Sequence, residues 1–309
     1  MTGPIPIAIV GVGKIARDQH LPAIAGNPAF ALAATVGHHD GVAGVPHYPD
    51  IDTLCDAHPE VAAVALCTPP QQRHALARAA LARGLHVLLE KPPGATVAEV
   101  ADLIACAQRA GRTLFAAWHS RFAPAVEPAR AWLAQRRVRS VAVVWKEDVR
   151  HWHPGQQWIW EAGGLGVFDP GINALSIATR ILPAPFFLTG GTLSFPANRE
   201  APIAADLRFA DADATPITAV FDWRQVGPQS WDITVETDDG RLEISRGGGA
   251  LRIAGIDQPC PAEAEYPGLY ARFAALIAAN GACDVDVTPL VHVADAFLAT
   301  RRVAVEAFA

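Results

Sequence analysis

The sequence has 309 residues, 51 % hydrophobic and 18 % charged, which is typical of a folded globular protein and excludes a disordered chain. The net charge of −6 gives no reason to expect nucleic acid or an anionic membrane as a partner, and no apolar run is long enough to span a membrane. The length exceeds that of a usual single domain, so we expect two.

The cysteine content bears on the cellular compartment. Five cysteines, an odd number without Cys-x-x-Cys spacing, argue against a disulfide framework and against a zinc site. The first strand-like run, 5–10, is not preceded by the basic start and cleavage site of a signal peptide. We therefore expect a reducing cytoplasm.

The first part of the chain alternates between short apolar runs and helical patterns. This alternation predicts right-handed βαβ units and a parallel, doubly wound sheet in a dinucleotide-binding domain of residues 1–120. Strands are expected at 5–10, 31–36, 61–67, 86–89 and 113–116, and helices at 71–83 and 97–109.

A glycine-rich run follows the first expected strand. It reads Gly11-Val12-Gly13-Lys14-Ile15-Ala16, a G-x-G-x-x-A pattern. Gly11 permits a tight turn, Gly13 lets a pyrophosphate approach the backbone, and Ala16 allows close helix packing. Because the run lies between a strand and a helix, it favours dinucleotide binding over an ordinary turn. The expected cofactor contacts here are Gly11, Gly13, Lys14 and Ile15.

The second expected strand ends without the carboxylate that usually binds the ribose of NAD. The sequence there reads Thr35-Val36-Gly37-His38. A 2′-phosphate would not be repelled and His38 can donate to it, so Gly37 and His38 indicate NADP, or dual use of NADP and NAD. The alternative is that Asp40 reaches back to the ribose.

The carboxyl ends of further strands are expected at the same edge of the sheet, which we call the cofactor rim. In a doubly wound sheet the ligand lies outside the carboxyl ends of the strands. We therefore expect the cofactor to be lined by Cys67, Thr68, Pro69, Glu90, Lys91 and His119.

Lys91 is the first candidate for chemistry. Only Lys14, Lys91 and Lys146 among the 25 cationic residues are lysine. A lysine can lose its proton when it is desolvated, whereas an arginine effectively cannot. Pro92 also ends the strand directly after Lys91. The plainer alternative is a solvated loop lysine.

The second domain, 121–309, is expected to be α/β with many strands. Turn signals at 238–240 and 247–249 favour antiparallel hairpins. An open antiparallel sheet leaves one face free, so we expect a homodimer or higher oligomer through that face. The expected strands are 138–145, 186–195, 203–209, 217–223, 231–236 and 241–245, and the expected helices are 125–136, 266–279 and 290–308.

The chemistry of the second domain is concentrated between residues 145 and 173. Glu147 follows a strand, and His151, Trp152 and His153 lie in a loop with further tryptophans. Flat indole rings beside polar side chains suit the faces of a sugar, although tryptophans can equally anchor a loop to the core. A His-x-His pair can bind metal, but no third ligand is evident, so we expect no metal.

A second glycine-rich run leads to Asp169. Asp169 before Pro170 has the form of a helix N-cap with proline at the first helical position. Asn173 would then lie four residues on, on the same helical face. Glycines at 163, 164 and 166 let other backbone or a ligand come close, which a plain cap does not need.

Together these residues resemble the glucose–fructose oxidoreductase/inositol dehydrogenase/rhizopine-catabolism (Gfo/Idh/MocA) family. The resemblance rests on the run 11–16, on Glu90-Lys91-Pro92 and on the glycine stretch leading to Asp169, and it covers the whole chain. It implies a Rossmann domain followed by an α+β domain with a large, mainly antiparallel open sheet, acting on sugars or polyols with NAD or NADP. Segments 14–22, 145–160 and 163–173 are most similar to bacterial L-arabinose/D-galactose 1-dehydrogenases.

The resemblance also implies roles for single residues. The family's lysine corresponds to Lys91, and its Asp-x-x-x-His pair corresponds to Asp169 and Asn173. Asparagine cannot titrate, so proton transfer would fall on Asp169 or Lys91, with Asn173 holding a hydroxyl. The expected substrate contacts are Lys91, Glu147, Trp152, His153, Asp169 and Asn173.

The implied activity is NAD(P)-dependent oxidation of an aldose at C1 to an aldonolactone. One alternative is an inositol or polyol dehydrogenase acting at another carbon. A second is a non-catalytic NADP-binding regulator, which the presence of both Lys91 and Asp169 disfavours.

Overall fold

A computed structural model describes residues 3–38, 40–279 and 281–309. The chain forms two compact units and crosses between them more than once. The first unit comprises residues up to His119 together with Tyr266–Val287, and the second comprises Ser120–Glu265 together with Thr288–Ala309. The helix expected at 266–279, which the sequence analysis placed in the second domain, therefore belongs to the first unit.

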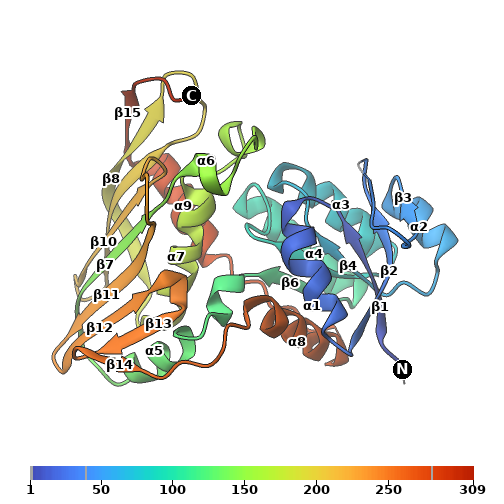
Figure 1. The fold of residues 1–309 in the computed structure, drawn as a ribbon, viewed down its shortest axis with the longest axis horizontal. Coiled ribbons are helices and arrows are strands. Elements are labelled where there is room, and N and C mark those ends of the chain that lie inside the picture. Colours follow the sequence, from blue (N-terminus) through green and yellow to red (C-terminus); the bar gives the residue numbers. More distant parts are fainter. Residues whose placement is uncertain (1–2, 39, 280) are drawn as a thin grey trace. The chain divides into compact units, whose positions relative to one another are not determined.

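The first unit contains a six-stranded sheet of order β3-β2-β1-β4-β5-β6, in which every pair is parallel (Figure 1). The predicted doubly wound parallel sheet is confirmed. Only the two-residue β3 was not expected. The strands are β1 (Ile5–Val10), β2 (Phe30–Val36), β3 (His47–Tyr48), β4 (Ala63–Leu66), β5 (His86–Glu90) and β6 (Leu114–Ala117).

Helices cover both faces of this sheet. The apolar side chains of α2, α3 and α4 pack with one face in a single core. On the other face Phe273 of α8 stacks on Phe115 and Phe30. Local signals set the helix ends, as in the capping box of Thr96 with Glu99 that starts α4. The helices are η1 (Ala16–His20), α1 (Leu21–Ala25), α2 (Ile51–Ala57), α3 (Pro70–Ala82), α4 (Val97–Ala110) and α8 (Glu265–Ala278), with η2 (His119–Phe122) at the crossing.

The second unit contains a nine-stranded sheet of order β14-β13-β12-β11-β7-β10-β9-β8-β15. The pairs β7–β10 and β8–β15 are parallel and the others are antiparallel, so the predicted mainly antiparallel sheet is confirmed. The strands are β7 (Val138–Lys146), β8 (Phe186–Pro196), β9 (Ala204–Asp211), β10 (Pro216–Asp222), β11 (Ser230–Thr237), β12 (Gly240–Ser245), β13 (Ala250–Ile253), β14 (Ile256–Gln258) and β15 (Arg301–Val305).

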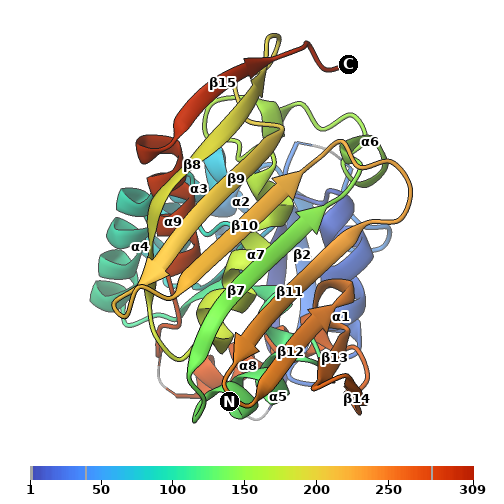
Figure 2. The ribbon, with the colours of Figure 1, turned by 90° about the vertical axis from the view of Figure 1, so that its left-hand side faces the viewer.

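Helices of the second unit lie on one face of its sheet. Figure 2 shows α5, α7 and α9 behind the strands, with no helix over the near face in the described chain. Buried Val141, Val143 and Trp145 alternate with more exposed side chains along β7, as expected for a sheet covered on one face. The helices are α5 (Val126–Leu133), α6 (Val149–Trp152), η3 (Trp158–Trp160), α7 (Phe168–Ile181), η4 (Arg246–Gly248) and α9 (Thr288–Ala299).

One predicted helix is too long. The helix expected at 290–308 ends at Ala299, and Arg301–Val305 instead forms β15, which pairs with β8. The edge of β8 supplies backbone partners there, and Val303 and Val305 are β-branched residues that favour a strand. No described helix is long and apolar enough to cross a membrane.

Candidate active site

The glycine turn after β1 has the predicted strand–turn–helix form. Gly11 has φ +88°, and a Cβ there would lie 2.8 Å from Thr68 Cγ2, so both its conformation and its close neighbour require glycine. A Cβ at Gly13 would meet nothing within 4 Å, which leaves open space in front of the backbone. Ala16 is fully buried against the unit interior. These observations fit a dinucleotide that approaches Gly13.

The end of β2 carries a feature that the sequence analysis missed. The guanidinium of Arg17 donates to the backbone carbonyl oxygens of Asp40 and Gly41, both at 3.1 Å, which places a positive charge beside the loop that follows Gly37 and His38. His38 and Asp40 are exposed. Arg17 comes directly after Ala16, the last residue of the glycine motif. This position in the sequence is the signal that could have indicated its role.

Glu90, expected on the cofactor rim, turns its carboxylate into the interior and is 2 % exposed. Its Oε2 accepts from the Lys91 N–H at 2.8 Å, and its Oε1 accepts from the Tyr266 hydroxyl at 2.7 Å. Arg73 donates to the carbonyl oxygens of Glu90 and Pro92. The backbone on both sides of Lys91 is therefore held by buried polar groups.

His20 completes this buried cluster. Its Nε2 lies 2.9 Å from Glu90 Oε1 and its Nδ1 lies 2.8 Å from the Tyr270 hydroxyl. Burial alone would raise the pKa of Glu90, but the hydrogen bond and charge of His20, with the nearby His119 and Arg73, lower it below its usual value. His119, an expected cofactor contact, stacks on Tyr266 with ring centroids 5.4 Å apart.

In the second unit, Asp169 lies in the first turn of α7 and is 3 % exposed. The helix N-cap is Val167, which makes no side-chain cap, so the interpretation of Asp169 as the N-cap is wrong. Pro170 is compatible with the first turn as well as with its first position, which is why the pattern misled. Asn173 lies one turn further along α7 and is partly buried.

The glycines before α7 allow close backbone packing. A Cβ at Gly164 would lie 2.1 Å from the carbonyl oxygen of Trp158, and one at Gly166 would lie 2.4 Å from that of Pro202. The expected close approach is therefore made by the chain's own backbone. These contacts determine where α7 starts, and with it the position of Asp169.

Glu147 follows β7 and is 3 % exposed. Its Oε1 accepts from Trp223 Nε1 at 3.3 Å, and its Oε2 accepts from Trp231 Nε1 at 2.9 Å. His153 Nε2 lies 3.5 Å from Glu147 Oε1 and 3.6 Å from Asp169 Oδ2. The structure thus brings together three residues predicted as substrate contacts.

The tryptophans of this region differ in their exposure. Trp152 is exposed, and its ring lies 5.1 Å from that of Trp231. Trp160 is buried, with its ring 5.1 Å from that of Trp223, so it anchors the loop. Trp223 and Trp231 were expected on strands, with no connection to Glu147.

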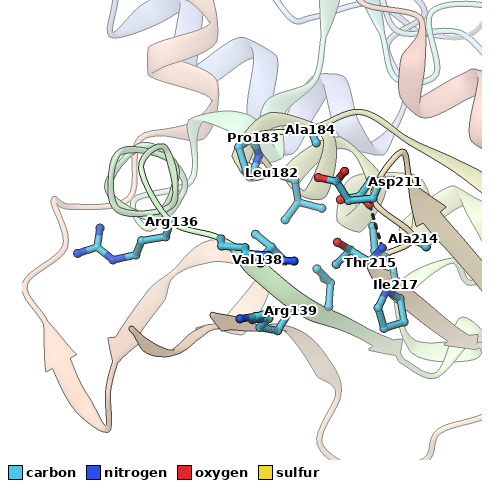
Figure 3. Close-up of a pocket in the computed structure, with 14 residues that line it drawn as sticks. Arg136, Val138, Arg139, Leu182, Pro183, Ala184, Asp211, Ala214, Thr215 and Ile217 are labelled. Carbon is cyan, nitrogen blue, oxygen red and sulfur yellow. Dashed lines mark hydrogen bonds between the residues drawn. The ribbon is translucent and has the colours of Figure 1, made fainter. Parts of the chain in front are cut away.

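A metal site and a further pocket were also considered. Among the described residues no group of three or more His, Cys, Asp or Glu side chains is arranged to hold a metal ion. A pocket of about 280 Å³ lies at the start of β7, the opposite end from Glu147 (Figure 3). Its Arg136 and Arg139 pair with Asp239 and Asp238, and its lining includes none of the predicted site residues.

Comparison with known proteins gives consistent matches. Residues 5–118 match the GFO_IDH_MocA family, described as an oxidoreductase family with an NAD-binding Rossmann fold. The chain is 45 % identical to galactose 1-dehydrogenase of Pseudomonas fluorescens over 305 residues, which is 99 % of each protein. It is 60 % identical to the crystal structure of D-galactose-1-dehydrogenase from Rhizobium etli, with a TM-score of 0.95 over 100 % of this chain and 99 % of that one.

A more distant structure shares the fold alone. KijD10, a 3-ketoreductase from Actinomadura kijaniata solved with NADP and TDP-benzene, is 18 % identical, with a TM-score of 0.86 over 98 % of this chain and 100 % of that one. The two-unit architecture is therefore retained at low sequence identity.

Proposed function

The chain belongs to the Gfo/Idh/MocA oxidoreductase family, and from this premise we propose that it oxidises an aldose at C1 to the aldonolactone. D-Galactose is the first candidate substrate and L-arabinose the second. The observation that carries the proposal is the similarity over 99 % of both chains to galactose 1-dehydrogenase of Pseudomonas fluorescens. The 60 % identity to the Rhizobium etli enzyme supports the same substrate class.

The first unit holds the cofactor in this proposal. When bound, NADP or NAD accepts a hydride at C4 of the nicotinamide. The open space at Gly13 receives the pyrophosphate, next to backbone N–H groups at the start of the following helix. Arg17 and His38 favour a 2′-phosphate at the ribose, so we propose NADP or dual use. The remaining proposed contacts are Gly11, Lys14, Ile15, Gly37, Cys67, Thr68, Pro69, Lys91 and His119.

Lys91 and Asp169 handle the proton of the C1 hydroxyl. Hydride departure from C1 is easy only when that oxygen loses its proton, so a base must lie within hydrogen-bond reach of it. Asp169 is a buried carboxylate on a rigid helix, and Lys91 has its backbone held by Glu90. We assign proton transfer to these two residues and the orientation of a hydroxyl to Asn173.

Sugar recognition is assigned to the cluster after β7. Trp152 offers a partly exposed indole face, and His153 lies beside it in the chain. Glu147 already accepts hydrogen bonds from two indoles, which favours a role in shaping this surface as well as in contacting a hydroxyl.

The experiment is a panel of aldoses and polyols assayed with NADP and with NAD, with the product trapped as an aldonohydroxamate. We expect reduction of the nucleotide with D-galactose or L-arabinose and a lactone product. Reduction with inositol or another polyol alone would show oxidation at a different carbon. If NADP binds but no compound of the panel reduces it, the alternative of a non-catalytic NADP-binding regulator would be favoured.

Assembly and location are also proposed. The sheet face without helices in Figure 2 is the surface we assign to a homodimer or larger oligomer, which the molar mass from light scattering tests. All five cysteines are free thiols, which fits the proposed cytoplasmic location.

A further inference from the structure

One ring nitrogen of His153 faces two buried carboxylates. Its Nε2 lies 3.5 Å from Glu147 Oε1 and 3.6 Å from Asp169 Oδ2. The Glu147 and Asp169 side chains are 4 % and 5 % exposed, whereas that of His153 is 17 % exposed. His153 is thus the member of this trio with the most access to water.

Hydrogen bonds hold each member of the trio in place. The His153 N–H donates to the Val149 carbonyl oxygen at 2.9 Å at the end of α6, and the Asp169 N–H donates to the Gly166 carbonyl oxygen at 2.8 Å. The Glu147 carboxylate accepts from both indoles described above. These two N–H donors fix the position of the carboxylate in front of the His153 ring.

The position of this trio matters because Asn173 cannot take up a proton. Asn173 shares a helical face with Asp169, but an amide only orients a partner. An imidazole titrates near neutral pH and can exchange its proton with water. The titratable groups that the structure records facing His153 are Glu147 and Asp169, and the Trp223 ring beside it, 5.4 Å away, is uncharged.

We propose that His153 is a positioning residue that acts through Asp169, relaying to water the proton which Asp169 removes from the sugar. This inference rests on the proposed function. The O–H bond of the C1 hydroxyl breaks and its proton passes to Asp169, and the electron pair left on the oxygen forms the C1–O double bond. The C1–H bond breaks at the same time, and its hydrogen leaves with both electrons as hydride to the nicotinamide. Asp169 then passes the proton to Nε2 of His153, Glu147 stabilises the imidazolium, and the ring releases the proton to water. Asp169 is thereby restored as a carboxylate.

The kinetic test compares His153→Gln with the wild type over a range of pH. Gln keeps a polar side chain but cannot titrate, so we expect kcat to fall by about 10- to 100-fold with KM changed less. The pH dependence of kcat should change, and added imidazole should restore part of the rate. His151→Gln is the matched control, because His151 is exposed and contacts the Trp152 ring, and it should leave the profile unchanged.

A lower kcat with an unchanged pH profile and no rescue by imidazole would show a structural role and overturn the proposal. A wild-type kcat in His153→Gln would also overturn the proposal. Retained cofactor affinity and an unchanged melting temperature would show that the variant folds.

A second measurement does not depend on turnover. In the free protein with isotopically labelled histidine, the ring-nitrogen signals of His153 should shift in Asp169→Asn, because the carboxylate oxygen that lies 3.6 Å from Nε2 is replaced. Unchanged ring signals would contradict the coupling. If no sugar in the panel is oxidised, the proposed function fails, whereas this comparison still decides whether the Asp169 side chain acts on the His153 ring.

Discussion

The Nε2 atom of His20 lies 2.9 Å from Oε1 of Glu90, with both side chains almost fully buried. Burial alone would lower the pKa of His20, but Cys67, Tyr270 and Glu90 together raise it well above its usual value. A protonated imidazole donates from both ring nitrogens, and Glu90 Oε1 and the Tyr270 hydroxyl oxygen are both able to accept. This buried ion pair lies directly behind the backbone of Lys91, because Glu90 also accepts from the Lys91 N–H.

We first predict a pH window for this stabilisation. The raised pKa of His20 gives stability that is complete below its ordinary value of 6.5 and is lost as pH rises through the folded value above it. The lowered pKa of Glu90 gives stability that is complete above its ordinary value of 4.5 and is lost as pH falls below it. The pair should therefore stabilise fully between pH 4.5 and 6.5. Melting temperature measured against pH checks this.

Two histidine variants separate the buried pair from an exposed one. His20→Gln should cost about 3–5 kcal/mol of unfolding free energy, because it leaves Glu90 without its cationic partner, and it should flatten the alkaline decline. His58 pairs with Glu60 at an exposed position, so His58→Gln should leave the alkaline decline unchanged. Equal behaviour of the two variants would mean that burial of the His20–Glu90 pair has no effect on stability.

Tyr266→Phe is the second prediction. It removes one O–H donor to a buried carboxylate without changing the ring, so it should cost about 1.5–3 kcal/mol of unfolding free energy. Because that carboxylate holds the Lys91 N–H, kcat should fall as well while the affinity for NADP is kept. The measurements are urea unfolding and steady-state kinetics.

The chain supplies a control for this variant. Of its three tyrosines, Tyr48 is the one whose hydroxyl makes no hydrogen bond recorded among the described residues, so Tyr48→Phe should be nearly neutral. If Tyr266→Phe were equally neutral, the Tyr266–Glu90 hydrogen bond would not contribute to stability.

The comparison of sequence with structure shows which features local patterns can predict. The first parallel sheet and most strands of the second sheet were expected, because apolar periodicity and turn residues act over a few neighbours. The His20–Tyr270 hydrogen bond joins residues 250 positions apart, and nothing near Tyr270 indicates that α8 returns to the first unit. The partnership of Glu147 with Trp223 and Trp231 is similarly non-local.

Within the candidate site, residue identities were easier to predict than their surroundings. Asp169 and Asn173 were expected on one helical face, and α7 has them one turn apart. The N-cap assignment failed because a pattern of aspartate before proline does not decide whether a helix starts two residues earlier. The carboxylate of Glu90 was expected on the rim but points into the interior, where a histidine 70 positions away in the sequence balances its charge.

The third prediction concerns the cofactor. NADP should be used at least as well as NAD, and His38→Asp should shift kcat/KM toward NAD, because a carboxylate repels the 2′-phosphate and can bind the ribose hydroxyl. An aspartate at Gly37 is a poorer test, because Gly37 has φ +152°, where a side chain is strained. His38→Asn is the uncharged control. A wild type with a strong preference for NAD would contradict this prediction.

The fourth prediction is that activity survives exhaustive dialysis against EDTA. Proton transfer is assigned to Lys91 and Asp169, and the described residues include no cluster suited to a metal ion. Activity that is lost on chelation and restored by zinc would contradict this prediction and indicate a metal site at His151 and His153.

The last prediction separates a structural from a chemical role for Asp169. Because Val167 is the N-cap of α7, Asp169→Asn removes no helix cap, and the fold should persist. If Asp169 takes the proton, kcat should fall by roughly 10²–10⁴-fold, and Lys91→Ala should be at least as damaging. Asn173→Ala should reduce kcat less than either, because Asn173 orients a hydroxyl but does not titrate. The double variant of Asp169 and Lys91 should lose far less than the product of the two single losses, because the effects of residues that act as a unit are not additive.

Cofactor affinity, measured by fluorescence, should be kept in Asp169→Asn. Near-wild-type turnover in that variant would leave Lys91 as the base and Asp169 as a buried structural carboxylate.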